Sequence, residues 1–302
     1  MYIIFKQIIL TNFKKRIVMN LINSSASLGG EIVGIKIDAK LTKDHIDFIN
    51  TSWDERLVLV FKNQNVDDKT LINFSKNFGE LDPPGPNPYG ITFLPEFPEI
   101  NVISNVKSKE GTPIGNLGDG EAVWHADMTY QEIPPKAGIL YSLEVPKNQG
   151  NTHFANMALA YEELPNALKS KIEGKKLIHD SAHNSAGMLR KGYSEIKEPS
   201  ETPGARHPIA ITDQKTNKKF LFLGRRPHAY IIGLDVNESE DLLDAIWDHA
   251  TQEKYTWTQK WEKGDLLMWK NLNVLHKRDA FDPNTRRIMH RTQLKGETRI
   301  YA

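Results

Sequence analysis

The chain has 302 residues, 39 basic and 38 acidic, so it is long enough for a substantial core and nearly neutral overall. This balance, together with the lack of a basic block interleaved with aromatics, argues against nucleic-acid binding. The sequence contains no cysteine, which excludes disulfides, thiolate zinc sites, iron–sulfur clusters and a cysteine nucleophile. Any metal must therefore be held by histidine and carboxylate side chains.

The first residues form an apolar segment, 2–10, which Lys6 interrupts and which is too short to span a bilayer. The basic run at 14–16 follows this segment, which is the wrong order for a signal peptide. We interpret residues 1–18 as an extension, or as sequence upstream of a true start at Met19. Residues 19–302 would then form a single domain, in a cytoplasmic protein without membrane contacts.

The next part of the chain alternates short predicted strands and helices. Strands are predicted at 32–37, 57–61 and 100–106. A helix capped by Thr42 should begin at Lys43, and a second helix should run from about Asp68 to Gly79.

Two loops flank the predicted strand at 100–106. One is the proline-rich segment 82–98, and the other is the glycine-rich segment 111–120. Both are long enough to be functional, and we expect them to include lid elements.

The second half of the chain contains mostly short predicted strands. They fall at 138–143, 152–156, 219–223 and 266–269, and helices are predicted at about 158–174 and 238–252. Many short strands with a few helices are typical of an antiparallel sandwich or barrel rather than of a parallel sheet. We therefore predict a mainly β fold with flanking helices.

The triplet His125-Ala126-Asp127 is the first candidate part of a metal site. On a strand, residues two apart point to the same face, so both side chains could reach one ion. The same spacing occurs in His45-Ile46-Asp47, within a predicted helix where such residues diverge. Because the spacing alone arises readily by chance, further residues have to support the site.

His276, shortly after the predicted strand at 266–269, is the candidate third ligand. Two histidines and one carboxylate leave three positions open on Fe(II), which can then bind O2 and a bidentate co-substrate. A further strand is predicted at 286–292, with Arg287 and Arg291 on one face. Buried arginines need anionic partners, and a dicarboxylic co-substrate would be one.

Four motifs together resemble the taurine / 2,4-dichlorophenoxyacetate dioxygenase (TauD/TfdA) family. They are Trp-His-Ala-Asp at 124–127, Gly-Asn-Thr at 150–152, His276, and Arg-Arg-Ile-Met-His-Arg at 286–291. The resemblance extends from about Gly29 to Gly296. It implies a double-stranded β-helix, a cupin-like jelly roll with helices packed outside.

The resemblance also implies the reaction. His125, Asp127 and His276 would be the catalytic residues that bind Fe(II), and 2-oxoglutarate and O2 would be consumed with release of succinate and CO2. The presence of Asp127 favours hydroxylation, because related halogenating enzymes lack this carboxylate. Arg287 and Thr152 would hold the far carboxylate of 2-oxoglutarate.

For the primary substrate, the resemblance implies a contact between Arg291 and an acidic group. We therefore expect a small anionic substrate, such as a carboxylate or a sulfonate. Further candidates for an anion pocket or substrate contacts are Arg225, Arg226, His228, Tyr89 and Asn116, although the first three fit a solvated loop equally well. The sequence does not determine the oligomeric state, and a homo-oligomer is compatible with it.

One tetrapeptide departs from the family pattern. Where the family usually has Trp-Asp-Asn-Arg, this chain has Trp269-Lys270-Asn271-Leu272. Loss of both charged partners can cost little, but it leaves the loop before His276 as the least secure part of the prediction.

Two alternatives remain open at this point. One is a cupin-like metal enzyme that uses the same triad without 2-oxoglutarate, and the other is a non-catalytic binding protein of the same fold. Arg287 and Thr152 argue against the first alternative, and the complete ligand set argues against the second.

Overall fold

The computed structural model describes residues 19–214 and 216–301, and the two largest of the four β-sheets in these residues share a core. The N-terminal extension predicted at 1–18 lies outside the described residues. The larger sheet has the order β1 (Asn20–Asn23), β2 (Gly30–Val33), β3 (Val58–Phe61), β16 (Leu266–Lys270), β8 (Ala137–Glu144), β18 (Ile288–Leu294), β5 (Asn101–Ser104) and β6 (Asn116–Leu117), and β4 (Leu81–Asp82) also pairs with β18. The smaller sheet has the order β15 (Thr256–Gln259), β9 (Thr152–Asn156), β17 (Val274–Arg278) and β7 (Ala122–His125).

Apolar residues cover both faces of the central strands of the larger sheet. In β16, Met268 belongs to the core beneath the first two helices, whereas Leu267 and Trp269 belong to the core between the two sheets. The ring of Trp269 lies 5.9 Å from that of Phe154, on the smaller sheet. Successive strand residues point to opposite faces, so these strands need apolar residues at every position.

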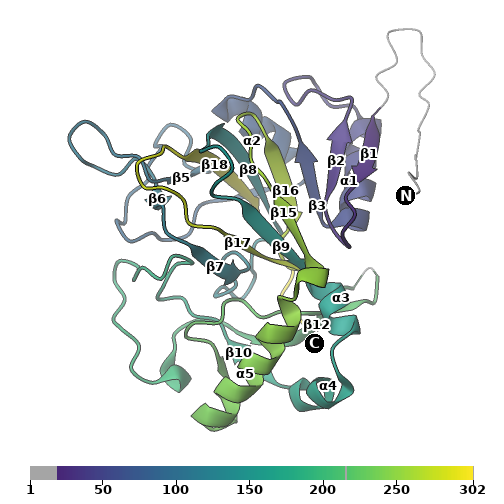
Figure 1. Ribbon diagram of the computed structural model, residues 1–302, viewed down its shortest axis with the longest axis vertical. Coiled ribbons are helices and arrows are strands. Elements are labelled where there is room, and N and C mark those ends of the chain that lie inside the picture. The colour runs from purple at the N-terminus through teal and green to yellow at the C-terminus, as the bar shows by residue number, and fades with distance from the viewer. Residues whose placement is uncertain (1–18, 215, 302) are drawn as a thin grey trace.

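Two helices, α1 (Lys43–Arg56) and α2 (Asp68–Lys76), cover the outer face of the larger sheet near the top of Figure 1. Both begin as predicted, because the side chains of Thr42 and Asp67 accept hydrogen bonds from the first turn. His45 accepts a hydrogen bond from the Thr42 amide and so takes part in this cap rather than in a metal site.

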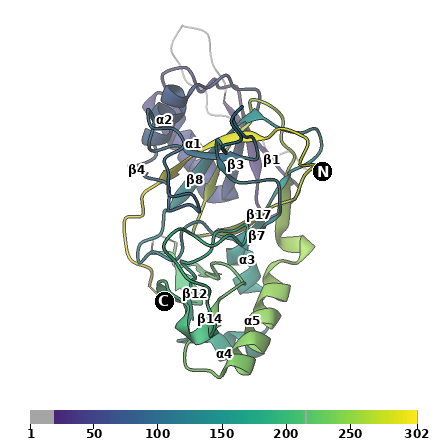
Figure 2. The ribbon, with the colours of Figure 1, turned by 90° about the vertical axis from the view of Figure 1, so that its left-hand side faces the viewer.

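A segment between β9 and β15 forms a separate core at the opposite end of the molecule, as both views show (Figure 1, Figure 2). It contains α3 (Met157–Glu162), α4 (Asn166–Ile172), β10 (Lys176–Ile178), β11 (Arg206–Pro208), β12 (Ala210–Thr212), β13 (Lys219–Leu221), β14 (Tyr230–Ile231) and α5 (Val236–Ala250), with short 3-10 helices at Pro199–Glu201 and Glu253–Tyr255. Within the described part of the chain, no helix has the length and apolar character needed to cross a membrane.

Several predicted elements differ from the observed ones in their extent, and two of these differences have a clear local cause. The helix expected at 158–174 is divided into α3 and α4, and Pro165 lies at the N-cap of α4. Proline has no amide hydrogen to donate, so an uninterrupted helix through this position would lose a hydrogen bond. The strand expected at 32–37 ends at Val33, and Gly34 has φ +81°.

Candidate metal centre and adjoining cavities

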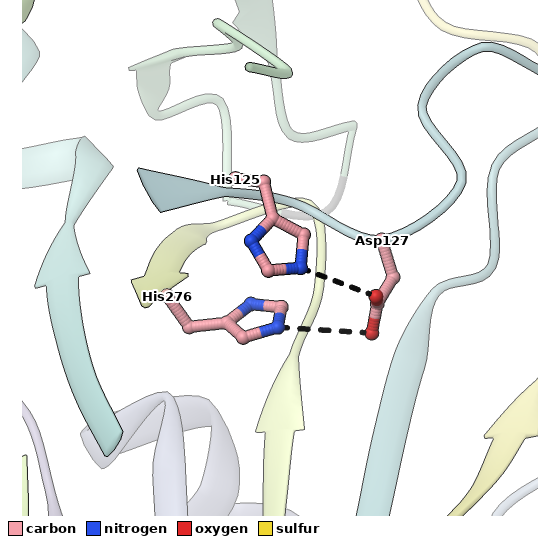
Figure 3. A group of neighbouring side chains, drawn as sticks. All are labelled: His125, Asp127 and His276. Carbon is pink, nitrogen blue, oxygen red and sulfur yellow. Dashed lines mark ion pairs between the residues drawn. The ribbon is translucent and has the colours of Figure 1, made fainter. Parts of the chain in front are cut away.

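The two candidate histidine ligands face each other across neighbouring strands. β7 and β17 are antiparallel, and His276 is the direct partner of His125 in their register. The two ring centroids are 4.1 Å apart. The pairing of two strands from distant parts of the chain therefore places the two imidazoles side by side (Figure 3).

Asp127 completes the group, although it lies in the turn just after β7 and not on the strand itself. Its carboxylate oxygens lie 3.6 Å from His125 Nε2 and 3.9 Å from His276 Nε2. One ligand atom from each of the three residues lies within 4.8 Å of the others. In Figure 3 the carboxylate faces both imidazoles, so the three side chains converge as the sequence predicts.

Asn271 holds the backbone of Asp127 in this position. The Asp127 amide donates to Asn271 Oδ1 at 2.7 Å, and Asn271 Nδ2 donates to the carbonyl oxygens of Asp127 and Pro135 at 2.9 and 2.8 Å. Asn271 is 1% exposed. Sequence reasoning missed this role, because a contact between residues 144 positions apart leaves no local pattern.

The residues that depart from the family tetrapeptide have other partners. Lys270 forms an ion pair with Asp54 of α1, and Leu272 packs against the apolar core formed by the segment between β9 and β15. The loop between β16 and β17 therefore keeps its Asn271 contacts to the metal ligand despite both changes.

Hydrogen bonds and local electrostatics prepare the candidate ligands for metal binding. His125 Nδ1 donates to the Val123 carbonyl at 2.7 Å, which leaves Nε2 directed to the site. Burial would raise the pKa of Asp127, but Arg291 and the two imidazoles hold it well below its ordinary value. Burial and the neighbouring His125 lower the pKa of His276, so this imidazole stays neutral. Two imidazoles and a carboxylate are a donor set that suits Fe(II).

A cavity behind the metal centre contains a buried cation without an anionic partner. Arg287 is 2% exposed, and no carboxylate within residues 19–214 and 216–301 forms an ion pair with it. Burial and the nearby Arg278 lower its pKa to about 9. The cavity is also lined by Thr152 and by both histidine ligands. A dicarboxylate that reached from Arg287 towards the metal would supply the missing charge.

Two neighbours shape this cavity. Gly150 has φ +62°, and a Cβ atom there would lie 3.3 Å from Cδ and Nε of Arg287, which explains the glycine in the Gly-Asn-Thr motif. The Thr152 hydroxyl accepts a hydrogen bond from Trp261 Nε1 at 2.9 Å. Its hydrogen is therefore free to be donated to a bound carboxylate.

A second, outer cavity lies beside Asp127. Arg291 borders both cavities and donates from Nη1 to the two oxygens of Asp127 at 2.9 and 2.8 Å. Arg287 and Arg291 are both buried, whereas His290 between them on the strand pairs with Asp68 of α2. The predicted alternation along this strand is therefore confirmed.

The remaining sequence candidates divide between the outer cavity and the surface. Asn116 and Arg225 line the cavity, and Gly85, Pro86 and Asn87 of the proline-rich segment border it. Arg225 forms an ion pair with Asp180, so it is not a free cation. Tyr89 is 41% exposed and does not line the cavity.

Arg226 and His228 lie outside the lining of this cavity. Arg226 pairs with Glu240 and Asp244 on α5. His228 stacks on His183 at a ring distance of 4.2 Å. Neither residue therefore contributes to the outer cavity.

The sequence profile of the family described as "Taurine catabolism dioxygenase TauD, TfdA family" matches residues 22–293. The alpha-ketoglutarate-dependent 2,4-dichlorophenoxyacetate dioxygenase of Burkholderia sp. (strain RASC) is 28% identical over 88% of this chain and 91% of its own length. The protein of the same description from Cupriavidus pinatubonensis is 30% identical over 80% of this chain and 86% of its own.

A solved structure supports the same relationship. AAD-2, in complex with Mn(II) and N-oxalylglycine, superposes with a TM-score of 0.75 at 26% identity, covering 94% of this chain and 99% of the other. The predicted double-stranded β-helix fold is confirmed by this similarity and by the two sheets described above.

Proposed function

Because the chain belongs to the TauD/TfdA family of dioxygenases, we propose that it hydroxylates a small anionic substrate, using Fe(II), O2 and 2-oxoglutarate and releasing succinate and CO2. The observation that carries this proposal is the convergence of His125, Asp127 and His276 beside a buried Arg287, which has no anionic partner among the residues that the structure describes.

The three converging side chains would be the iron ligands. When bound, Fe(II) would activate O2 for the hydroxylation of a substrate C–H bond. The protein contributes the geometry: the strand pair places the imidazoles, and Asn271 and Val123 fix Asp127 and His125. Three ligands on one side leave room for a bidentate co-substrate and O2.

Arg287 and Thr152 would hold 2-oxoglutarate. A guanidinium binds a carboxylate through two parallel hydrogen bonds, and the buried position strengthens this contact. The cavity that contains Arg287 also reaches both histidine ligands, so one small dicarboxylate could contact the arginine and the metal together. This arrangement favours 2-oxoglutarate chemistry over a cupin-like enzyme that lacks the co-substrate.

Arg291 would contact an acidic group of the primary substrate. It lies beside the metal ligand Asp127 at the border of the outer cavity, where the substrate would have access to the metal. The two relatives named above act on 2,4-dichlorophenoxyacetate, which is a carboxylate. The single domain at 19–302, the cytoplasmic location and a homo-oligomeric state remain predictions.

The test is the production of succinate by anaerobically iron-loaded enzyme after O2 is admitted, with a panel of small acids. His276→Ala and Asp127→Ala should abolish it, because each removes a ligand. His153→Ala is the matched control, since His153 lies on the neighbouring strand and pairs with Asp279 instead of facing the metal. Wild-type turnover by His276→Ala at ordinary iron concentration would refute the ligand assignment.

A further inference from the structure

Three residues that line the outer cavity each carry a buried hydrogen-bond donor without an acceptor among the described residues. Tyr130 Oη, Asn184 Nδ2 and Arg190 Nε are each buried and have no hydrogen-bond partner among the residues that the structure describes. Tyr130 follows the metal ligand Asp127 closely in sequence, whereas the other two come from the loop between β10 and β11. Unpaired buried donors are costly, so three of them on one cavity indicate a ligand with acceptor oxygens.

The protein holds these donors in place before any ligand binds. Arg190 Nη1 donates to the Ser181 carbonyl at 2.7 Å, and its guanidinium lies 4.2 Å from the centroid of the Tyr130 ring. Asn184 Oδ1 accepts from two backbone amides of its own turn at 3.0 Å, which directs Nδ2 elsewhere. A site that is ordered in advance loses less entropy when the ligand binds.

The outer cavity is lined by three arginines but only two aspartates. Asp127 pairs with Arg291, and Asp180 pairs with Arg225. Arg190 has no carboxylate partner within the described parts of the chain. Both acids that line the cavity are thus already paired with other arginines, and Arg190 gives the wall an excess positive charge.

The two arginines that could bind acidic groups occupy different places. Arg291 borders the outer cavity and the co-substrate cavity, whereas Arg190 borders the outer cavity alone. We propose that Tyr130, Asn184 and Arg190 form a distal anion subsite for a second acidic group, so that the preferred substrate is a dianion. This inference rests on the proposed function, in which Arg291 contacts the acidic group nearer the metal.

The test compares linear dicarboxylates with monocarboxylates of equal chain length, from about six to ten carbons. Each acid is titrated calorimetrically, under argon, into enzyme saturated with Fe(II) and 2-oxoglutarate, so that the co-substrate cavity is filled and no turnover occurs. The best dicarboxylate should bind about 10-fold or more tightly than its monocarboxylate, because a charge-assisted hydrogen bond is gained.

Substitutions then test which residues cause the preference for the dicarboxylate. Arg190→Met should weaken binding of the dicarboxylate by about 10- to 100-fold and that of the monocarboxylate by about twofold at most. Asn184→Asp keeps the turn-forming oxygen and replaces the donor with an acceptor, so it should also weaken the dicarboxylate selectively. Lys197→Met removes an exposed charge from the same loop and should change neither affinity.

Two results would overturn the inference: equal affinities for the matched acids in the wild type, or equal weakening of both acids by Arg190→Met. If Arg190→Met does not fold, the isosteric Asn184→Asp variant decides between these outcomes. Failure of the proposed function is distinguishable, because wild-type enzyme would then form no succinate from 2-oxoglutarate with any acid, whatever the calorimetry shows.

Discussion

Replacement of Asn271 by alanine should weaken iron binding although Asn271 is not a ligand. Its amide makes three hydrogen bonds to backbone groups, two of them on Asp127, at 2.7–2.9 Å. Without them the turn that carries the Asp127 carboxylate is no longer tied to the loop before His276. Loss of groups that orient metal ligands costs about 10- to 100-fold in metal affinity.

The same substitution should also lower the free energy of unfolding. It removes three hydrogen bonds at a position that is 1% exposed, and each is worth about 1 kcal/mol net. The Asp127 amide and two carbonyls are left without their partner, so we expect a loss of about 3 kcal/mol or more. Asn271→Asp should be worse, because its second oxygen would face two carbonyl oxygens.

The two effects are measured separately. Urea unfolding gives the stability, and titration of the enzyme with Fe(II) in the presence of 2-oxoglutarate, under argon, gives the affinity. Gln64→Ala is the matched control: this 8% exposed amide also makes three hydrogen bonds to the backbone, but to Ile35, Ile37 and Lys62 rather than to a candidate metal ligand. It should lose stability and keep its iron affinity.

Wild-type iron affinity in a folded Asn271→Ala protein would refute the reasoning. The amide would then be a structural bridge alone, like that of Gln64. Partial recovery of Asn271→Ala activity at high iron concentration, with no such recovery for Gln64→Ala, would support it.

Three further outcomes are expected. Arg287→Met should raise the KM for 2-oxoglutarate by about 10- to 100-fold and that for the substrate far less, since only the co-substrate loses a charge-assisted contact; equal changes in both would contradict this role. N-oxalylglycine should raise the thermal unfolding midpoint of metal-loaded wild type more than that of Arg287→Met, and identical shifts would argue against the pairing. Burial lowers the pKa values of His179 and His207, so below about pH 6.5 the unfolded chain binds more protons than the folded protein. The free energy of unfolding therefore decreases as the pH is lowered through this range, by up to about 1.4 kcal/mol per pH unit for each histidine. His179→Leu should flatten this slope in urea titrations between pH 7.5 and 5.5, and an unchanged slope would exclude His179 as a contributor.

Local patterns in the sequence were sufficient for several parts of this protein. The helix starts at Thr42 and Asp67 depend on side chains that cap the adjacent turn, so they can be recognised without tertiary information. The inward direction of Arg287 and Arg291 follows from strand alternation. The ligand residues could be named because four widely spaced motifs occur together in a pattern that resembles one family.

The contacts between these elements could be established only from the tertiary structure. The pairing of His125 with His276, the amide bridge from Asn271 to Asp127 and the ion pair of Arg225 with Asp180 join residues far apart in the chain. That Arg190 has no carboxylate partner in the described part of the chain could not be predicted either, because it depends on which acids the fold brings near and which of them already have partners. Periodicity reports the direction of a side chain from its own element, whereas the partner it finds there is set by how distant elements pack.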